Sequence, residues 1–418
     1  MTMQTGGAEI NECLQAVKES KRNNDASWVA QWANAAERVG KTAEDAERSG
    51  RIITARQAYL RASSYYRAAM FSLPPTDMHL LQYLTLSREY FHKAAKLFSP
   101  QVEILNIPLG DGLLPGYFLS AGPSKHPTLI ALNGGDSTNE ELVHWFGFAA
   151  VERGWNYLVF EGPGQWSALQ LNPGLTLRVD YEVPVKAAIN YLLTRDDVDA
   201  ERIALYGCSL SSLLGARAVA FEKRICACVL AGGPVIDVNE AWEAVWPPFL
   251  QKAVPGVFNF LFTQWARINP RLAGFANHYK WVFDVKTPRE LIEAWRPFNI
   301  KGIAPKIACP LLLINGEADY AQTDARTALT TLRFINELAC PVAIHEFSYE
   351  DGWAASHCQI GALSAAQAVI FDWLDRTVNS PGRIENAVPK HTWTMLNRYH
   401  NTNALNREIA KSIRIDAV

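Results

Sequence analysis

The segment that most constrains the fold of this chain runs from Arg202 to Ala220, with the sequence RIALYGCSLSSLLGARAVA. The apolar run Ile203–Tyr206 predicts a buried strand, and Leu213–Ala220 predicts a helix. Ser209 lies on the short turn between them, in the pattern Gly-Cys-Ser-Leu-Ser. A serine on a sharp strand-to-helix turn is typical of a nucleophile elbow, normally G-x-S-x-G, in which strain holds the hydroxyl clear of the sheet. The alternative is an ordinary turn whose serine caps the helix.

The composition favours a soluble protein with a large core. Of the 418 residues, 49% are hydrophobic and 20% are charged. A net charge of −2 gives no electrostatic reason to expect a nucleic acid or an anionic membrane as partner. Seven cysteines without C-x-x-C pairs are typical of a reducing compartment. The polar N-terminal segment does not resemble a secretory signal, and no apolar stretch approaches the roughly 18 residues that span a bilayer. We therefore expect a cytoplasmic location.

Hydrophobic periodicity changes along the chain. Up to about residue 100 the pattern is helical, as in Ala55–Phe71, where apolar residues fall on one face. Helical patterns also cover Glu140–Glu152, Glu182–Leu193 and Ala362–Thr377. Between these helices, short apolar runs bounded by Gly, Pro and Asp predict strands. We predict eight, at Val102–Pro108, Gly116–Leu119, Thr128–Leu132, Tyr157–Phe160, Ile203–Tyr206, Cys226–Leu230, Leu311–Asn315 and Val342–Phe347. This alternation implies an α/β fold whose mostly parallel sheet is covered by helices on both faces.

The same pattern divides the chain into regions. We predict a helical N-terminal domain at residues 1–100 and an α/β core in two parts, 101–233 and 307–378. A helical cap insertion, 234–306, separates the two parts of the core, and a C-terminal tail follows at 379–418. The insertion is rich in aromatic residues. Its place after the sixth strand puts it over the carboxyl ends of the strands, where open α/β sheets bind ligands. It can be a small subdomain with its own core, a lid over a pocket, or both.

A serine nucleophile needs a base, and the base needs a carboxylate to orient it. After such an elbow, the acid usually comes next along the chain and the histidine last. Asp319 lies three residues past the glycine that ends the seventh predicted strand, and Glu317 is the alternative acid. His357 lies in the loop between the last strand and the last helix. His345 falls inside a predicted strand, where a packing role is expected instead.

Two backbone N–H groups must receive the oxyanion that forms when a serine attacks a carbonyl. One donor is expected at Leu210, directly after the serine. The other is expected in the loop after the third strand, where Gly134 and Gly135 permit close approach of the backbone. The sequence contains no phosphate loop, metal-ligand cluster or G-x-G-x-x-G fingerprint, so we expect no cofactor and no metal.

Several motifs together carry a family resemblance. Asn133–Ser137 (NGGDS), Glu161–Gln165 (EGPGQ), the elbow and His357–Gln359 (HCQ) resemble a branch of α/β-hydrolases with a helical N-terminal domain. That branch includes the 2,6-dihydropseudooxynicotine hydrolases, and the polyketide chain-shortening hydrolases of fungal pigment pathways are similar in build. Ala58–Ala62 and Tyr65–Arg67 also resemble its N-terminal helical motif.

The resemblance implies an α/β-hydrolase fold and a catalytic role for Ser209, Asp319 and His357. It also implies a homodimer formed through the N-terminal helices. In members that break carbon–carbon bonds, an acid of the cap contributes. Glu240 falls about where that acid is expected, with Asp237 as the alternative.

Two positions depart from the family pattern. Ser211 and Trp166 each stand where a glycine is usual. Ser211 is expected to narrow the oxyanion pocket. Trp166 is expected to line the substrate pocket, together with Trp242 and Trp246 of the insertion. Both departures suggest a specialised substrate.

These residues lead to three functional hypotheses. The first is a serine hydrolase that attacks a carbonyl of an apolar, aromatic or polyketide-like small molecule, with cleavage of a C–C bond of the β-diketone type or of an ester. The second is an acyltransferase or a cyclase that uses the same three residues while excluding water. The third is a non-catalytic ligand-binding pseudoenzyme, against which the complete set of Ser209, Asp319 and His357 argues.

Overall fold

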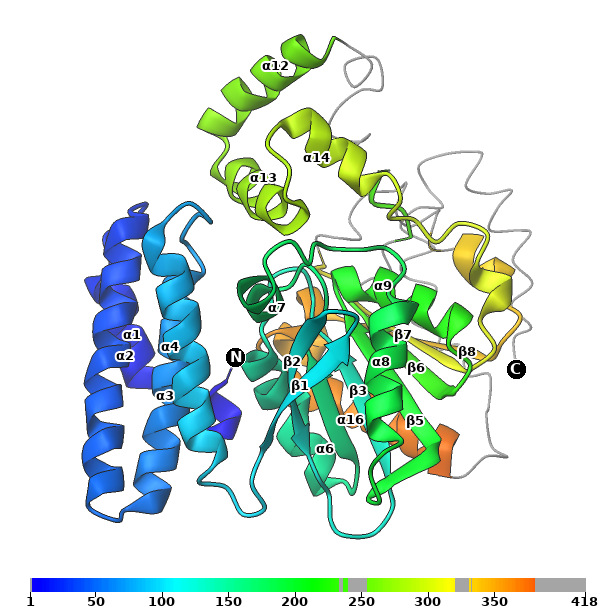
Figure 1. Cartoon of the computed structure of the whole chain (residues 1–418), viewed down its shortest axis with the longest axis horizontal. Helices are drawn as coiled ribbons and strands as arrows, with labels where there is room; N and C mark the ends of the chain where they lie inside the picture. The colour runs from blue at the N-terminus through cyan, green and yellow to red at the C-terminus, as the bar shows by residue number, and fades with distance from the viewer. Residues whose placement is uncertain (1, 233–235, 240–253, 320–330, 332, 380–418) are drawn as a thin grey trace.

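A computed structural model describes residues 2–232, 236–239, 254–319, 331 and 333–379 of the chain. The chain begins with helices that pack side by side on one flank of the molecule (Figure 1). They are the short η1 (Met3–Thr5), α1 (Ile10–Glu19), α2 (Asp25–Arg48), α3 (Ile52–Met70) and α4 (Met78–Ala95). The helix predicted over Ala55–Phe71 is confirmed as α3. Tyr59, Tyr65 and Tyr66 are buried on it, as expected for the face that the sequence pattern predicts to be apolar.

An eight-stranded sheet forms the centre of the molecule, in the order β1-β2-β4-β3-β5-β6-β7-β8. β2 pairs antiparallel with β1 and β4, and every other neighbouring pair is parallel. All eight predicted strands are present. Their bounds are β1 (Glu103–Leu109), β2 (Gly112–Leu119), β3 (His126–Leu132), β4 (Asn156–Phe160), β5 (Val198–Cys208), β6 (Ile225–Ala231), β7 (Leu311–Gly316) and β8 (Val342–Phe347).

Helices cover both faces of the sheet, as predicted (Figure 1). Alternate strand residues point to opposite faces, so Leu205 packs with α8 (Glu182–Leu192) and α9 (Leu210–Phe221), whereas Tyr206 packs with the other layer. That second layer contains α5 (Asn139–Leu142), the π-helical turn η2 (Val143–Gly147), α6 (Phe148–Glu152) and α16 (Leu363–Leu374), which is followed by η7 (Asp375–Asn379). The helix predicted over Glu140–Glu152 is thus interrupted by a π turn.

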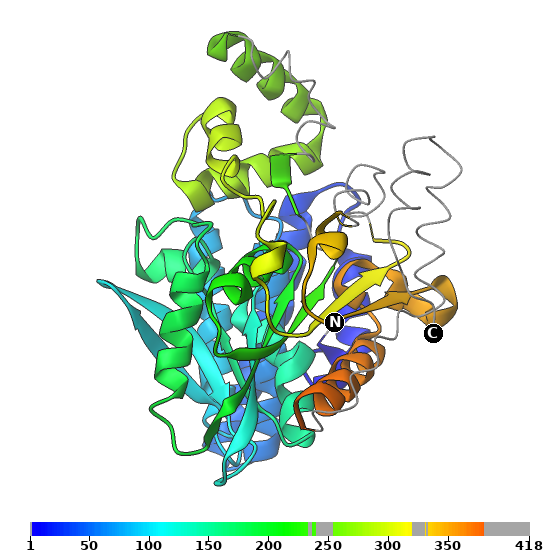
Figure 2. The ribbon, with the colours of Figure 1, turned by 90° about the vertical axis from the view of Figure 1, so that its right-hand side faces the viewer.

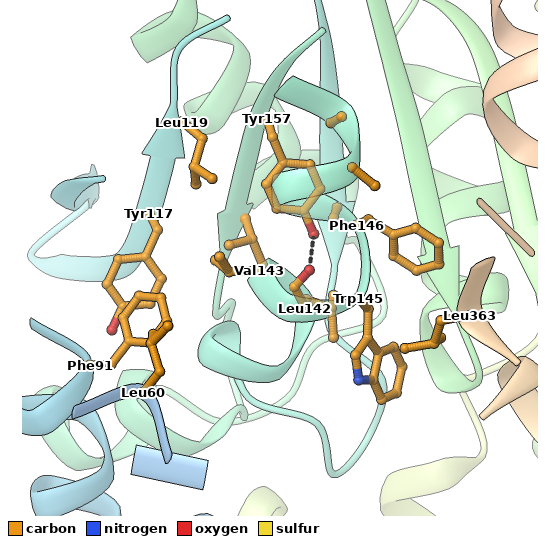
Figure 3. Close-up of a cluster of buried hydrophobic side chains, with 14 of the residues drawn as sticks. Leu60, Phe91, Tyr117, Leu119, Leu142, Val143, Trp145, Phe146, Tyr157 and Leu363 are labelled. Atoms are coloured by element: carbon orange, nitrogen blue, oxygen red, sulfur yellow. Dashed lines mark hydrogen bonds between the residues drawn. The ribbon is translucent and has the colours of Figure 1, made fainter. Parts of the chain in front are cut away.

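The N-terminal helices extend the second core layer. Phe91 of α4 packs on Tyr117 of β2, with ring centroids 4.7 Å apart. Figure 3 shows this pair beside Leu60 and, further in, Tyr157, whose hydroxyl donates to the Leu142 carbonyl at 2.9 Å. The helical N-terminal segment and the core therefore share buried apolar surface, which stabilises their association.

The described part of the insertion is helical and lies beyond one end of the sheet (Figures 1 and 2). It contains α12 (Pro255–Ile268), α13 (Pro270–Phe283) and α14 (Pro288–Trp295), followed by η3 (Ala304–Lys306). α13 contacts the loop after β3, because a Cβ at Gly135 would lie only 2.0 Å from the Tyr279 hydroxyl oxygen. We refer to α12–α14 as the cap. The residues of the tail from 380 onward lie outside the described residues.

Candidate active site

Ser209 lies between the end of β5 and the start of α9, with φ 54° and ψ −121°. Few non-glycine residues adopt a positive φ, so this turn stores strain of the kind found at functional sites. Its N–H donates to the Ala231 carbonyl at 2.9 Å, which ties the turn to the end of β6. Gly207 permits the turn, since a Cβ there would lie 2.1 Å from the Ser211 carbonyl oxygen. The geometry is that of a nucleophile elbow.

The structure brings His357 and Asp319 to this turn. The Nε2 atom of His357 lies 3.0 Å from Ser209 Oγ, and its Nδ1 lies 2.8 and 2.9 Å from the two oxygens of Asp319. A carboxylate only accepts, so Nδ1 carries the proton and a neutral ring presents the Nε2 lone pair to the serine. The Asp319 side chain is fully buried, whereas Ser209 and His357 are half-buried. The serine and the base therefore remain reachable.

The parallel order of the strands explains why residues so distant in sequence meet. β5, β6, β7 and β8 are parallel neighbours, so their carboxyl ends share one edge of the sheet. Asp319 follows β7, and its N–H donates to the carbonyl of Gly316 at 2.9 Å. His357 follows β8, on η6 (His357–Gln359) after η5 (Tyr349–Ala355). The Ala318 N–H donates to the Ala355 carbonyl at 2.9 Å, which links the loop after β7 to the loop after β8.

Glu317, the alternative acid, and His345 make other contacts. Glu317 accepts the N–H of Tyr349 at 3.1 Å and so braces the loop after β8. His345 lies within β8, where its ring packs on Phe347 with centroids 4.4 Å apart. Neither contact involves Ser209.

The loop after β3, Asn133–Thr138, lies against the elbow, and we call it the β3 loop. A Cβ at Gly134 would be 3.4 Å from Ser209 Cβ. The Gly134 N–H donates to Ser137 Oγ at 2.7 Å. The N–H of Gly135 makes no hydrogen bond within the described residues. Leu210 is the first residue of α9, so its N–H has no acceptor within the helix. Of the two glycines, Gly135 is therefore the one whose N–H is available to an oxyanion.

The two departures from the family pattern both contact the β3 loop. Ser211 is fully buried, and its hydroxyl donates to the Asn133 carbonyl. Trp166 begins α7 (Trp166–Leu171), a short helix that the periodicity did not predict. Its indole N–H donates to the Asp136 carbonyl at 3.0 Å, and its ring lies 5.7 Å from that of Trp281. Trp166 is only 5% exposed and packs where the N-terminal helices, core and cap meet.

Three predicted positions lie outside the described residues: Glu240, Trp242 and Trp246. Asp237, the alternative cap acid, is described. Its carboxylate pairs with Lys301 at 2.6 Å and accepts the N–H of Asn239 at 2.8 Å. This pairing links the start of the insertion to its end.

Sequence reasoning missed three side chains that hold the β3 loop. Arg67 of α3 donates to the Asp136 carbonyl at 2.6 Å, and His278 of α13 lies 2.9 Å from the Gly135 carbonyl. Gln165 donates to the carbonyls of Asn133 and Gly134 at 2.7 and 3.0 Å. Arg67 and Gln165 belong to motifs that carry the family resemblance, and this was the available signal. His278 had none.

The described residues also bear on metal binding and on membrane spanning. Among them, no group of three or more His, Cys, Asp or Glu side chains is arranged to hold a metal ion. Among the same residues, no helix is both long and apolar enough to cross a membrane.

An elbow serine, an acid and a histidine at the carboxyl edge of a parallel sheet covered on both faces define the α/β-hydrolase class. Comparisons with known proteins agree. Residues 10–245 match the family model described as esterase FrsA-like. The 20-hydroxy-prefusarin hydrolase FUS2 of Gibberella moniliformis is 31% identical over 391 residues, covering 89% of this chain and 92% of that protein. The hydrolase LUC6 of a Fusarium species is 30% identical over the same coverage.

The fold also has a similar solved structure. The crystal structure of the 2,6-dihydroxy-pseudo-oxynicotine hydrolase superposes with a TM-score of 0.72 at 20% identity, covering 93% of this chain and 98% of that one. The chain belongs to the FrsA-like family of α/β-hydrolases. The resemblance and the fold predicted from the sequence are thereby confirmed.

Proposed function

We propose that this protein is a serine hydrolase acting on a carbonyl of an apolar, aromatic or polyketide-like small molecule. The observation that carries the proposal is the chain of hydrogen bonds from Ser209 Oγ through His357 to Asp319, at 3.0 and 2.8 Å. Each member takes the role its contacts suit. Ser209 is the nucleophile, His357 the base, and Asp319 the carboxylate that orients the ring.

The proposed reaction has two halves. His357 Nε2 accepts the Ser209 proton as Oγ bonds to the carbonyl carbon, and the N–H groups of Leu210 and Gly135 receive the resulting oxyanion. The tetrahedral intermediate then expels its leaving group, which takes the proton from His357. In the second half, water gives its proton to His357 and attacks the acyl-serine, which releases a carboxylic acid and restores Ser209.

The leaving group is either carbon or oxygen. A carbon leaving group requires a second carbonyl one carbon away, which stabilises the carbanion until His357 protonates it. An oxygen leaving group makes the same site an esterase. The cap supports an apolar substrate, because α13 places aromatic residues against the β3 loop: Tyr279 lies beside Gly135, and Trp281 packs on Trp166.

The test compares a 1,3-diketone with the ester of matched shape in ¹⁸O-labelled water. We expect cleavage of at least one of them, with one labelled oxygen in the acid product. Ser209→Ala should lower kcat by about 10⁴-fold or more, whereas Ser124→Ala, a change at an exposed serine, should not. Unchanged turnover in Ser209→Ala would overturn the nucleophile. Acyl products that carry no ¹⁸O would instead indicate the acyltransferase or cyclase reaction.

A further inference from the structure

Gln165 is a buried amide that the reaction scheme above does not use. It lies in the loop after β4, directly before α7, and is 4% exposed. Its Oε1 accepts the N–H of Gly162 at 2.7 Å and the hydroxyl of Tyr181 at 3.1 Å. Its Nε2 faces two carbonyl oxygens, those of Asn133 and Gly134. Donors surround one end and acceptors the other, so the network fixes the orientation of the amide.

The contact with Gly134 controls the neighbouring N–H. In a trans peptide the C=O and the N–H point in opposite directions. When Gln165 binds the Gly134 carbonyl at 3.0 Å, it turns the Gly135 N–H of the same peptide the other way. The preceding peptide is held likewise, with its carbonyl on Gln165 and Ser211 and its N–H on Ser137. In these two peptides, the Asn133 and Gly134 carbonyls and the Gly134 N–H all have hydrogen-bond partners. Within the described residues, the Gly135 N–H has none.

We propose that Gln165 is a positioning residue that directs the Gly135 N–H at the developing oxyanion, an inference that rests on the proposed function. Glycines have no side chain to restrict their backbone, so the Gly134–Gly135 peptide needs an external partner to hold one orientation. Gln165 is that partner, and the N–H of Gly162, which donates to its Oε1 at 2.7 Å, holds its far end in place. The Ser211 hydroxyl adds a second bond to the same loop from the nucleophile helix.

The experiment measures the second-order rate at which a fluorophosphonate labels Ser209, a reaction whose charged transition state requires the same donors. Removal of one oxyanion donor typically costs about 10²–10³ in rate. We expect Gln165→Glu to lower the labelling rate by about 10²-fold. Glutamate keeps the acceptor for Gly162 and Tyr181 but loses both donors. In Gln165→Met, which adds no charge near His357, the pH midpoint of the rate should be unchanged.

Tyr181→Phe is the matched control. It also removes a buried hydrogen bond of Gln165, but on the acceptor side, and leaves both Nε2 contacts in place. Both variants should lower Tm, and only the change at Gln165 should slow labelling. If Gln165→Glu fails to fold, Gln165→Met, which has similar volume and no charge, should show the same loss of rate.

The outcomes separate the inference from the function on which it rests. Labelling of a folded Gln165 variant within twofold of wild type would overturn the positioning role and leave the serine hydrolase intact. Equal slowing by Tyr181→Phe would also overturn it, because a purely structural role would suffice. A wild-type protein that the probe does not label at Ser209 would overturn the proposed function itself.

Discussion

The N-terminal helices and the cap hold the same β3 loop by different chemistry. From α3, Arg67 binds the Asp136 carbonyl and pairs with Glu141 at 2.8 Å, and both side chains are nearly buried. From the cap, His278 binds the Gly135 carbonyl through Nε2, and its ring lies 4.9 Å from that of Trp166. One attachment is a buried ion pair and the other is a hydrogen bond from an imidazole.

The difference between the two attachments has an energetic consequence. Burial raises the pKa of Glu141 even though Arg67 opposes this, which shows how costly the carboxylate would be without its partner. Burial lowers the pKa of His278, so the neutral ring that donates to Gly135 is its stable form. Separating the N-terminal helices from the core would leave charges unpaired, whereas opening the cap breaks a neutral contact. Of these two contacts, the one from the N-terminal helices is therefore the more costly to break.

Removal of Arg67 should have the largest effect. Arg67→Met leaves Glu141 buried without its partner and should lower the free energy of unfolding by about 3–5 kcal/mol. In the double variant Arg67→Met/Glu141→Gln no charge remains, and most of the loss should be recovered. Denaturant unfolding measures both. A double variant no more stable than the single one would contradict the ion-pair explanation.

Removal of His278 should have a smaller and more local effect. His278→Phe keeps a ring against Trp166 and Trp281 but loses one hydrogen bond, so we expect a loss of about 1 kcal/mol. Hydrogen exchange should become faster in α13 and stay unchanged in α3. Equal acceleration in the two helices would show that cap and N-terminal helices are not independently attached.

The smallest effect concerns His144, which the N-terminal segment covers. Its Nδ1 lies 2.6 Å from Thr5 Oγ1, and burial lowers its pKa to about 3. As the pH falls below about 6.5, the unfolded chain gains a proton here and the native chain does not, so stability falls. Between pH 7 and pH 6 wild type should lose about 0.7 kcal/mol more than His144→Asn. Equal losses in denaturant unfolding would contradict the assignment.

The sequence predicts the strands of the sheet better than it predicts the tertiary contacts of the helices that cover the sheet. Apolar runs bounded by Gly and Pro locate all eight strands. Most of them are buried by the helices on either side, and the edge strands β1 and β8 are only partly buried. The π turn at Val143–Gly147 was not predicted, since it depends on tertiary contacts such as the one between Gln367 of α16 and the Trp145 carbonyl at 2.6 Å. Hydrophobic periodicity along the sequence does not indicate such contacts.

In the candidate site, too, some residues could be predicted from the sequence and others could not. Ser209, Asp319 and His357 were predicted because each follows a strand in a fixed order. The contacts of Arg67 and His278 with the β3 loop join residues 69 and 143 positions apart, and no local pattern encodes them. Likewise, no local pattern indicates that the Ser211 hydroxyl donates to the Asn133 carbonyl.

Peptide mass mapping after treatment with a fluorophosphonate tests the central role of Ser209 most directly. We expect one adduct per chain, located on Ser209, absent from Ser209→Ala and formed far more slowly in His357→Ala. An adduct that persists in Ser209→Ala, or a wild-type protein that stays unmodified while folded, would contradict it.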